Sequence, residues 1–230
     1  MSKIGTTMAG ASLVLLAAGA ALAADHPGQK FTISPGSLPK PYATPAVGNE
    51  PSSIPRPAGA MPEVPRGFQV SIFADNLTDP RWMAVAPNGD IFLAEPPGGY
   101  KAGSGGKITV LRDSNGDGKA DKSFTFLPAS AGFVYPHGLA FHDGYLYVGD
   151  VRGIWRFPYS DGQTAAGKPE KVTTKVADLQ PKNGHITRDI AFGPDGGLYL
   201  ALGSKDNISD YKPGAQVFKI NADGSMSEFA

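Results

Sequence analysis

The sequence has no cysteine and no excess of charge of either sign. Without cysteine, disulfides, thiolate catalysis and thiolate-bound zinc or iron–sulfur sites are excluded. The 21 basic and 21 acidic residues cancel, so neither a nucleic acid nor an anionic membrane surface is expected as the main partner. A helical bundle is excluded as well, because 30 glycines and 21 prolines among 230 residues are typical of short strands joined by tight turns.

The first 24 residues have the layout of a secretory signal peptide. Lys3 precedes an apolar run over 8–22, and Ala21-Leu22-Ala23 supplies a small-x-small cleavage site. An uncleaved membrane anchor is the alternative, but the run is short and contains two glycines. We therefore expect residues 1–24 to be removed, no stable membrane insertion, and a periplasmic or secreted mature protein.

Residues 25–66 read as a proline-rich tether. They contain 10 prolines in 42 residues and show no sustained period of 2 or 3.6. Each proline removes a backbone donor and interrupts helices and strand ladders. We expect a polyproline-II-like strap or linker, with the folded domain in residues 67–230.

Three similar stretches follow within residues 67–230. Each is an apolar strand, an Asn-Gly or Asp-Gly turn and an alternating strand, which predicts a hairpin. The stretches are 81–95, 137–150 and 188–202, with turn glycines Gly89, Gly144 and Gly196 spaced by 55 and 52 residues. Two further strands are predicted behind each hairpin, at Lys107–Arg112 and Ser123–Leu127, Ile154–Pro158 and Val172–Ala177, and Gln216–Ile220 and Ser225–Ala230.

Four antiparallel strands repeated every fifty-odd residues indicate an all-β fold, a β-propeller of which about three blades are present. A β-sandwich also has many short strands, but it does not produce internal similarity at this period. Residues 67–230 hold only these three repeats, whereas propellers close with about four to eight blades. We therefore expect this sequence to be the N-terminal part of a longer protein and to be inactive alone, with Phe68–Phe73 as a strand that completes the last blade.

The repeats resemble the glucose/sorbosone dehydrogenase family, especially its sorbosone-dehydrogenase-like branch. The resemblance is carried by Gly67-Phe-Gln-Val70 with 80–95, by 136–150, and by 184–199. It implies a six-bladed propeller that binds pyrroloquinoline quinone (PQQ) and oxidises a sugar. In that family a histidine takes the hydroxyl proton, hydride passes to the quinone, a calcium ion (Ca2+) polarises the quinone and arginines hold its carboxylates. The implied partners are a small-molecule sugar and a periplasmic electron acceptor, a cytochrome or a quinone.

Arg81, His137 and Arg188 occupy the same repeat position, immediately before each innermost strand. Loops that lead into innermost strands gather at one mouth of the central channel, so these side chains are candidate contacts for an anionic cofactor. The alternative is that they bridge blades by bonding to backbone carbonyls. Trp82 and Trp155 are assigned to core packing.

His185 matches the position of the family's catalytic histidine, and imidazole suits abstraction of an alcohol proton near neutral pH. Better-known glucose-oxidising members have an aspartate before this histidine, where this sequence has Gly184. An orienting carboxylate would have to come from elsewhere, for example Asp189. A ligand-contacting or structural histidine is the alternative. Asn207, or Lys205, lies in a polar loop similar to the family's Gly-Ser-x-x-Asn stretch and is a candidate cofactor contact; a plain surface loop is equally compatible.

The segment 113–121 predicts a structural calcium site. Its candidate ligands are Asp113, Asn115, Asp117 and Asp121, with a glycine at the sixth position for the turn. Phe124 stands where an EF-hand needs glutamate, so the loop resembles the shorter calcium turn of extracellular proteins. The alternative is a tight turn whose carboxylates face water.

Together these features predict a periplasmic PQQ-dependent sugar dehydrogenase with His185 as general base. One alternative is a non-catalytic propeller that binds a glycan or a protein partner at the same mouth. Another is a metal-dependent lactonase, for which Glu95 and Asp150 would be the candidate channel carboxylates.

Overall fold

The structure is a computed structural model that describes residues 26, 28–40, 42–48, 51–52, 54–96, 105–176, 178–179 and 184–230. The predicted signal peptide, residues 1–24, lies outside the described residues. The chain divides into two units, Met1–Pro39 and Lys40–Ala230. In the first unit, Pro35–Ser37 forms a short 3-10 turn, η1.

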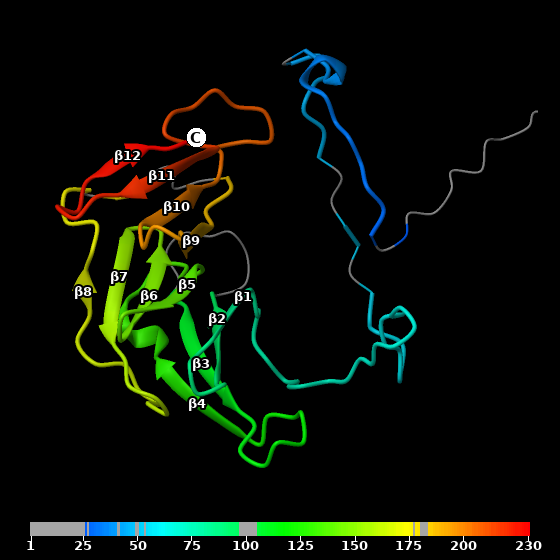
Figure 1. The fold of residues 1–230 in the computed structure, drawn as a ribbon, viewed down its shortest axis with the longest axis vertical. Coiled ribbons are helices and arrows are strands. Elements are labelled where there is room, and N and C mark those ends of the chain that lie inside the picture. Colours follow the sequence, from blue (N-terminus) through cyan, green and yellow to red (C-terminus); the bar gives the residue numbers. More distant parts are fainter. Residues whose placement is uncertain are drawn as a thin grey trace, which may run out of the picture. The chain divides into compact units, whose positions relative to one another are not determined.

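The second unit contains three four-stranded antiparallel sheets, each built from strands that are consecutive in the chain (Figure 1). The first sheet comprises β1 (Trp82–Val85), β2 (Ile91–Glu95), β3 (Lys107–Arg112) and β4 (Lys122–Leu127). After the 3-10 turn η2 (Ala129–Ala131), the second comprises β5 (Leu139–His142), β6 (Tyr145–Asp150), β7 (Gly153–Pro158) and β8 (Glu170–Lys171). The third comprises β9 (Arg188–Phe192), β10 (Leu198–Leu202), β11 (Gln216–Ile220) and β12 (Met226–Glu228). This arrangement confirms the predicted β-propeller blades.

The turn glycines explain why each blade begins with a hairpin. Gly89, Gly144 and Gly196 have φ values of 89°, 75° and 71°, a region that glycine adopts without a steric penalty. The hairpins then close in register, with Val85 opposite Ile91 and Phe192 opposite Leu198. The local turn chemistry therefore sets the pairing of the two inner strands.

The innermost strands lie side by side, β1 against β5 and β5 against β9 (Figure 1). Apolar residues fill the space between neighbouring blades, with one cluster around Phe92 and Leu146 and a second around Tyr147 and Leu200. The second and third blades also meet through the backbone, because Gly138 N donates to Arg188 O at 3.1 Å. A Cβ on Gly138 would lie 2.3 Å from that oxygen, so only glycine allows this approach.

Two predicted strands are wrong. Phe68–Phe73 forms no strand, and Phe68 is 71% exposed; no described strand lies beside it to share backbone hydrogen bonds, without which an extended segment is not a strand. The fourth strand of the second blade is Glu170–Lys171, not Val172–Ala177, because the chain turns away where Val176 N donates to Thr173 O.

Candidate functional site

The loops that lead into β5 and β9 pack against each other at one end of the innermost strands. Tyr135, Val151 and Ile186 form a small buried cluster between them. Tyr135 precedes His137 by two residues, and Ile186 directly follows His185. The cluster therefore fixes the two loops that carry the predicted site histidines.

His137 is paired with Asp189 across the two blades. Its Nδ1 lies 2.7 Å from Asp189 Oδ1, and the histidine is only 8% exposed. The contact is close, but the two atoms do not meet in hydrogen-bond geometry, so the pair is ionic only when the ring is protonated. Asp189 therefore does not orient His185, as the sequence had suggested, but holds His137.

Arg188 lies inside the molecule with no exposed surface. Its guanidinium donates to the backbone carbonyls of Leu179 at 3.0 Å and Thr187 at 2.9 Å, and at 3.5 Å to that of His185. Burial lowers the pKa of Arg188 from 12.5 to about 10, against the opposing effect of nearby Asp150. These contacts match the alternative in which the arginine bonds to backbone carbonyls, and they make it a clamp on the loop that carries His185.

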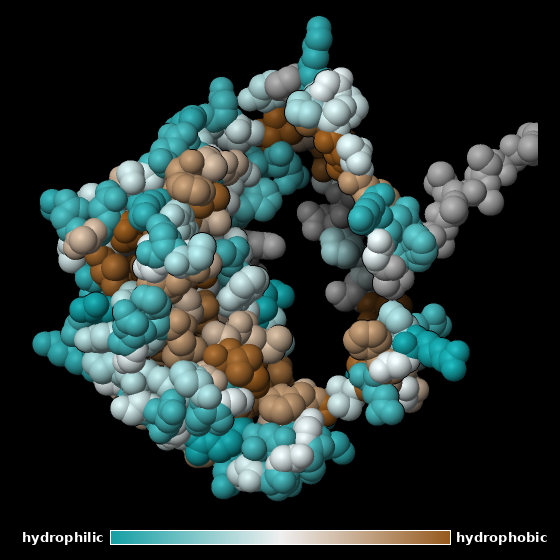
Figure 2. Space-filling model, viewed as in Figure 1, coloured by the Kyte–Doolittle hydropathy of each residue, from teal (hydrophilic) through white to brown (hydrophobic). Residues whose placement is uncertain are grey.

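Arg81 does not join His137. It lies with Phe73, Met83 and Leu93 around a largely apolar hollow of about 530 Å³ on the first blade. In Figure 2, apolar surface is visible over this blade beside hydrophilic surface. Trp82, the next residue, instead has its ring 5.8 Å from His137. Because successive side chains of a strand point to opposite faces, Arg81 is turned away from the second blade.

His185 is exposed, and its tautomer follows from its neighbours. Nδ1 lies 3.0 Å from Ser204 Oγ and 3.3 Å from Ser204 O, while Ser204 Oγ donates its own proton to Asp206 O. Both serine oxygens can therefore only accept from the ring, so Nδ1 carries the proton and Nε2 has the free lone pair. That is the form a general base requires.

Gly184 is required by the backbone around His185. It has φ 75°, and a Cβ there would lie 1.9 Å from Lys205 O. An aspartate cannot occupy this position without moving the loop between β10 and β11. The group that orients the histidine here is Ser204, which belongs to the stretch similar to the family's Gly-Ser-x-x-Asn.

The donors beside His185 fit one end of an anionic quinone. Lys205 and Asn207 are exposed on the loop that also provides Ser204, and the Lys205 ammonium lies 5.4 Å from the ring centre of Tyr211. An ammonium and an amide can bind carboxylates and carbonyl oxygens. Lys205 and Asn207 stay candidate contacts for PQQ, whereas Arg188, which has no exposed surface, bonds to backbone carbonyls instead.

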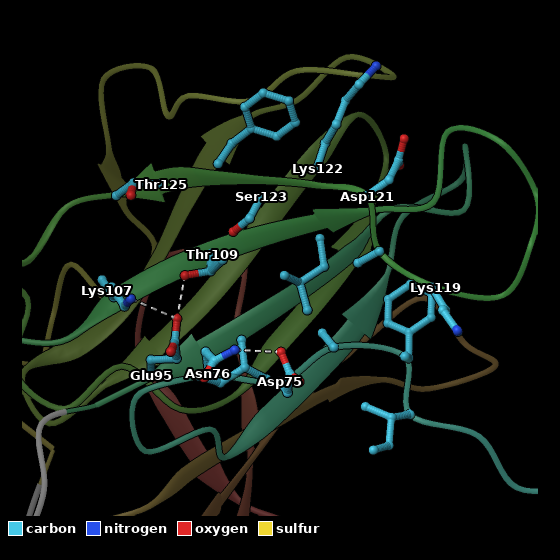
Figure 3. Close-up of a pocket in the computed structure, with 17 residues that line it drawn as sticks. Asp75, Asn76, Glu95, Lys107, Thr109, Lys119, Asp121, Lys122, Ser123 and Thr125 are labelled. Carbon is cyan, nitrogen blue, oxygen red and sulfur yellow. Dashed lines mark hydrogen bonds and ion pairs between the residues drawn. The ribbon is translucent and has the colours of Figure 1, made fainter.

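A separate groove of about 660 Å³ runs over β2–β4 beside residues 72–77 (Figure 3). Its buried carboxylate, Glu95, accepts hydrogen bonds from Thr78 N at 2.6 Å and from Thr109 Oγ1, and pairs with Lys107 at 3.2 Å. In the second blade, buried Asp150 likewise accepts from Val134 N, Arg152 N and Trp155 Nε1. Both carboxylates accept hydrogen bonds that hold loops in place, and among the described residues neither belongs to a group of three His, Asp or Glu that could hold a metal.

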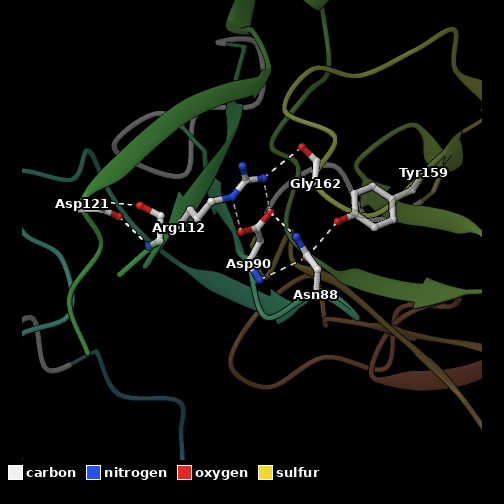
Figure 4. Close-up of polar contacts among 7 residues, drawn as sticks. Asn88, Asp90, Arg112, Asp121, Tyr159 and Gly162 are labelled. Atoms are coloured by element: carbon white, nitrogen blue, oxygen red, sulfur yellow. Dashed lines mark hydrogen bonds and ion pairs between the residues drawn. The ribbon is translucent and has the colours of Figure 1, made fainter. Parts of the chain in front are cut away.

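An ion pair within the first blade also reaches the second blade through a hydrogen bond to a backbone carbonyl (Figure 4). Arg112 donates to both oxygens of Asp90 at 2.7 Å and to Gly162 O at 3.0 Å. The hydrogen bond from Arg112, helped by Asn88, lowers the pKa of Asp90 despite its burial. Tyr159 O–H donates to Asn88 at 3.2 Å, which adds a second link between the blades.

The predicted calcium loop is a tight turn held by its own carboxylates. Asp113 accepts from the backbone N–H groups of Gly116, Asp117 and Gly118, and Asp121 accepts from Ser114 (Figure 4). Among the described residues, no three His, Asp or Glu side chains are grouped as a metal site. Calcium at Asp113, Asn115, Asp117 and Asp121 stays a prediction.

Sequence reasoning missed two residues of the mouth. Trp82 is 42% exposed and so is not core packing, although its place at the start of an innermost strand could have indicated this. Ser204 belongs to the Gly-Ser-x-x-Asn-like stretch that the sequence singled out, but only the fold brings its hydroxyl to His185.

A family described as "Domain of unknown function (DUF7133)" matches residues 55–229. The chain belongs to this family. No curated protein matches this DUF7133 protein. Within the described part of the chain, no helix has the length and apolar character that a bilayer crossing requires.

Solved structures resemble this DUF7133 protein in fold. The holo form of the pyranose dehydrogenase PQQ domain from Coprinopsis cinerea is 20% identical over 70% of this chain, with a TM-score of 0.56. The PQQ-bound aldose sugar dehydrogenase from Streptomyces coelicolor is 21% identical, with a TM-score of 0.48. That match covers 67% of this chain and 48% of the Streptomyces chain. The chain spans 38% of the Coprinopsis domain. The chain thus shares the fold of part of the Coprinopsis pyranose dehydrogenase PQQ domain.

Proposed function

We propose that this DUF7133 protein forms part of a PQQ-dependent dehydrogenase that oxidises a sugar, or a sugar-derived alcohol or aldehyde, of the glucose or sorbosone type. The observation that carries the proposal is His185, exposed on its loop with Nδ1 held by Ser204 and Nε2 left as the acceptor. The fold shared with the pyranose dehydrogenase PQQ domain supports it.

His185 is assigned the hydroxyl proton of the substrate. Oxidation of an alcohol to a carbonyl removes a proton from oxygen and a hydride from carbon. Nε2 takes the proton, and the hydrogen bond from Nδ1–H to Ser204 stabilises the ring orientation in which that lone pair stays available. PQQ, when bound, supplies the acceptor for the hydride.

The rest of the chain prepares this geometry. Ile186 is fully buried beside Tyr135 and Val151, and Arg188 bonds to the carbonyls on both sides of the loop. A base fixed before substrate arrives loses less rotamer freedom on binding. Lys205 and Asn207 are assigned to the carboxylates and carbonyls of PQQ.

Three further parts of the proposal come from the sequence. Export to the periplasm is proposed from residues 1–24, and a structural calcium ion from the 113–121 loop. A cytochrome or a quinone is proposed as the electron acceptor.

Reconstitution of the full-length protein tests the proposal. The protein is loaded with PQQ and calcium, and the reduction of a redox dye is followed with aldoses, sorbosone and sugar alcohols. We expect turnover with at least one sugar and none with protein lacking PQQ. A protein that binds PQQ but oxidises no sugar or sugar derivative would remove the oxidoreductase assignment.

A further inference from the structure

Trp82 presents an aromatic surface at the mouth that the proposed reaction does not use. It begins β1 and is 42% exposed. Its ring centre lies 5.8 Å from that of His137, with 33° between the ring planes. The indole is therefore positioned by a neighbouring blade while much of its surface remains open.

His137 is itself held from two further sides. The ring of Tyr135 lies nearly parallel to it, with 6.5 Å between centres and 4° between planes, and Tyr135 is only 4% exposed. Asp189 Oδ1 lies 2.7 Å from Nδ1. The exposed indole is thus backed by rings anchored in the cluster of Tyr135, Val151 and Ile186, so a ligand would meet it with little loss of side-chain freedom.

Asp189 supplies a hydrogen-bond acceptor beside this surface. Its side chain is 40% exposed, although Oδ1 is buried against His137. The exposed part therefore lies on the Oδ2 side of the carboxylate. A carboxylate held in this position accepts hydrogen bonds from hydroxyl groups. Hydrogen bonds to a charged acceptor are stronger than those between neutral groups.

These two groups select one ligand chemistry. The face of an indole carries negative charge density that attracts polarised C–H groups and offers a flat apolar surface, and Asp189 adds an acceptor for hydroxyls. A pyranose ring has both features, a face of C–H groups and a rim of hydroxyl donors. A tricarboxylate such as PQQ suits the indole but is repelled by the carboxylate.

We propose that Trp82 and Asp189, the latter fixed by His137, form a binding subsite for the ring of a neutral pyranose sugar. The subsite rests on the proposed function in that it names the substrate class at the mouth that holds His185. Trp82 stacks on the ring face, and Asp189 accepts from ring hydroxyls. Ring closure is a requirement, since an open-chain polyol has no rigid face to stack.

Binding of sugar to the full-length protein without PQQ tests the subsite separately from turnover. The probes are D-glucose and its reduced open-chain form, D-glucitol, followed by calorimetry and by tryptophan fluorescence. We expect saturable binding of glucose and about tenfold weaker binding of glucitol, equivalent to one aromatic contact. Equal affinity for both, or no binding of glucose, would overturn the proposal.

Variants locate the binding. Trp82→Ala and Asp189→Asn are each expected to weaken glucose binding about tenfold, while Trp82→Phe, which keeps a smaller ring, loses about threefold. Met83→Ala is the matched control, because Met83 is the next residue of β1, is 63% exposed and lies on the other face of the strand; its glucose affinity is expected to match that of the parent protein. Affinities of the Trp82 and Asp189 variants within about twofold of the parent would refute the subsite.

Two comparisons separate this inference from the proposed function. Glucose binding that is lost in Trp82→Ala, in a protein that oxidises no sugar with PQQ, supports the subsite and favours the glycan-binding alternative. Turnover with an unchanged KM in both Trp82→Ala and Asp189→Asn refutes the subsite and leaves the oxidoreductase assignment standing. If PQQ and glucose compete for binding to the parent protein and do not compete in Trp82→Ala, the indole contacts the cofactor, and the proposal is overturned.

Discussion

Replacement of Arg188 by methionine tests the clamp on the loop that carries His185. The guanidinium has no exposed surface and donates to Leu179 O at 3.0 Å and Thr187 O at 2.9 Å. Methionine fills similar volume but has no donor. Two buried carbonyls that lose a partner cost about 1–3 kcal/mol each.

Removal of the buried charge offsets part of this loss. Burial lowers the pKa of Arg188 from 12.5 to about 10, and a shift of that size corresponds to roughly 3 kcal/mol of unfavourable desolvation. The two effects together predict that the free energy of unfolding of Arg188→Met lies at most about 3 kcal/mol below that of the parent. The assay is urea unfolding of the full-length protein, followed by far-UV circular dichroism.

Arg188→Lys distinguishes hydrogen-bond geometry from charge. Lysine keeps the charge and its desolvation cost but cannot present the planar fork of donors that reaches several carbonyls. We therefore expect Arg188→Lys to be at least as destabilising as Arg188→Met. An Arg188→Lys protein within about 0.5 kcal/mol of the parent would refute the clamp.

Two other predictions concern charge and calcium. Arg112 lowers the pKa of Asp90, so the pair stabilises the fold above the unfolded aspartate pKa of about 4, and this stabilisation is lost as the pH falls through the lower folded pKa. Asp90→Asn should therefore lower the free energy of unfolding by about 1–2 kcal/mol between pH 5 and pH 8. The difference from the parent should shrink below about pH 4. A difference that stays the same from pH 8 to pH 3 would contradict the ion pair. For the 113–121 loop, chelation should lower the melting temperature and excess calcium should restore it, whereas Asp121→Asn should show little response to either; a parent protein indifferent to chelation would leave the loop as a plain turn.

The features that depend on neighbouring residues were predicted well from the sequence. The hairpins follow from glycines in turns with alternating strands on both sides, so β3 and β11 have the predicted bounds of Lys107–Arg112 and Gln216–Ile220. Features that depend on residues far away in the sequence were not predicted. Phe68–Phe73 has the composition of a strand, but the described backbone donor that reaches it is Ala120 N, in a turn, which bonds to Phe73 O. β8 ends at Lys171 because of a turn at Thr173.

The site shows the same division. Equivalent repeat positions led us to expect Arg81, His137 and Arg188 at one mouth, yet each has a different environment, since each meets a different neighbour. Arg188 meets backbone carbonyls, His137 meets Asp189, and Arg81 lines an apolar hollow. A repeat predicts where a side chain starts, but its contacts are set by the adjacent blade.

The role of Ser204 illustrates what the fold adds. The sequence located His185 and the missing aspartate at Gly184, but not the replacement partner. Only the close approach of the loop between β10 and β11, at which a Cβ on Gly184 would meet Lys205 O, brings the serine to Nδ1.

The turnover of a His185→Ala protein loaded with PQQ tests the central claim most directly. We predict a loss in kcat of about 10²–10⁴-fold, with PQQ affinity, measured by absorbance titration on the same sample, within about threefold of the parent. His26→Ala, a histidine of the first unit that bonds only locally to Gln29, serves as the matched control and should keep the parent kcat. An unchanged kcat in His185→Ala would contradict the assignment of Nε2 as the proton acceptor.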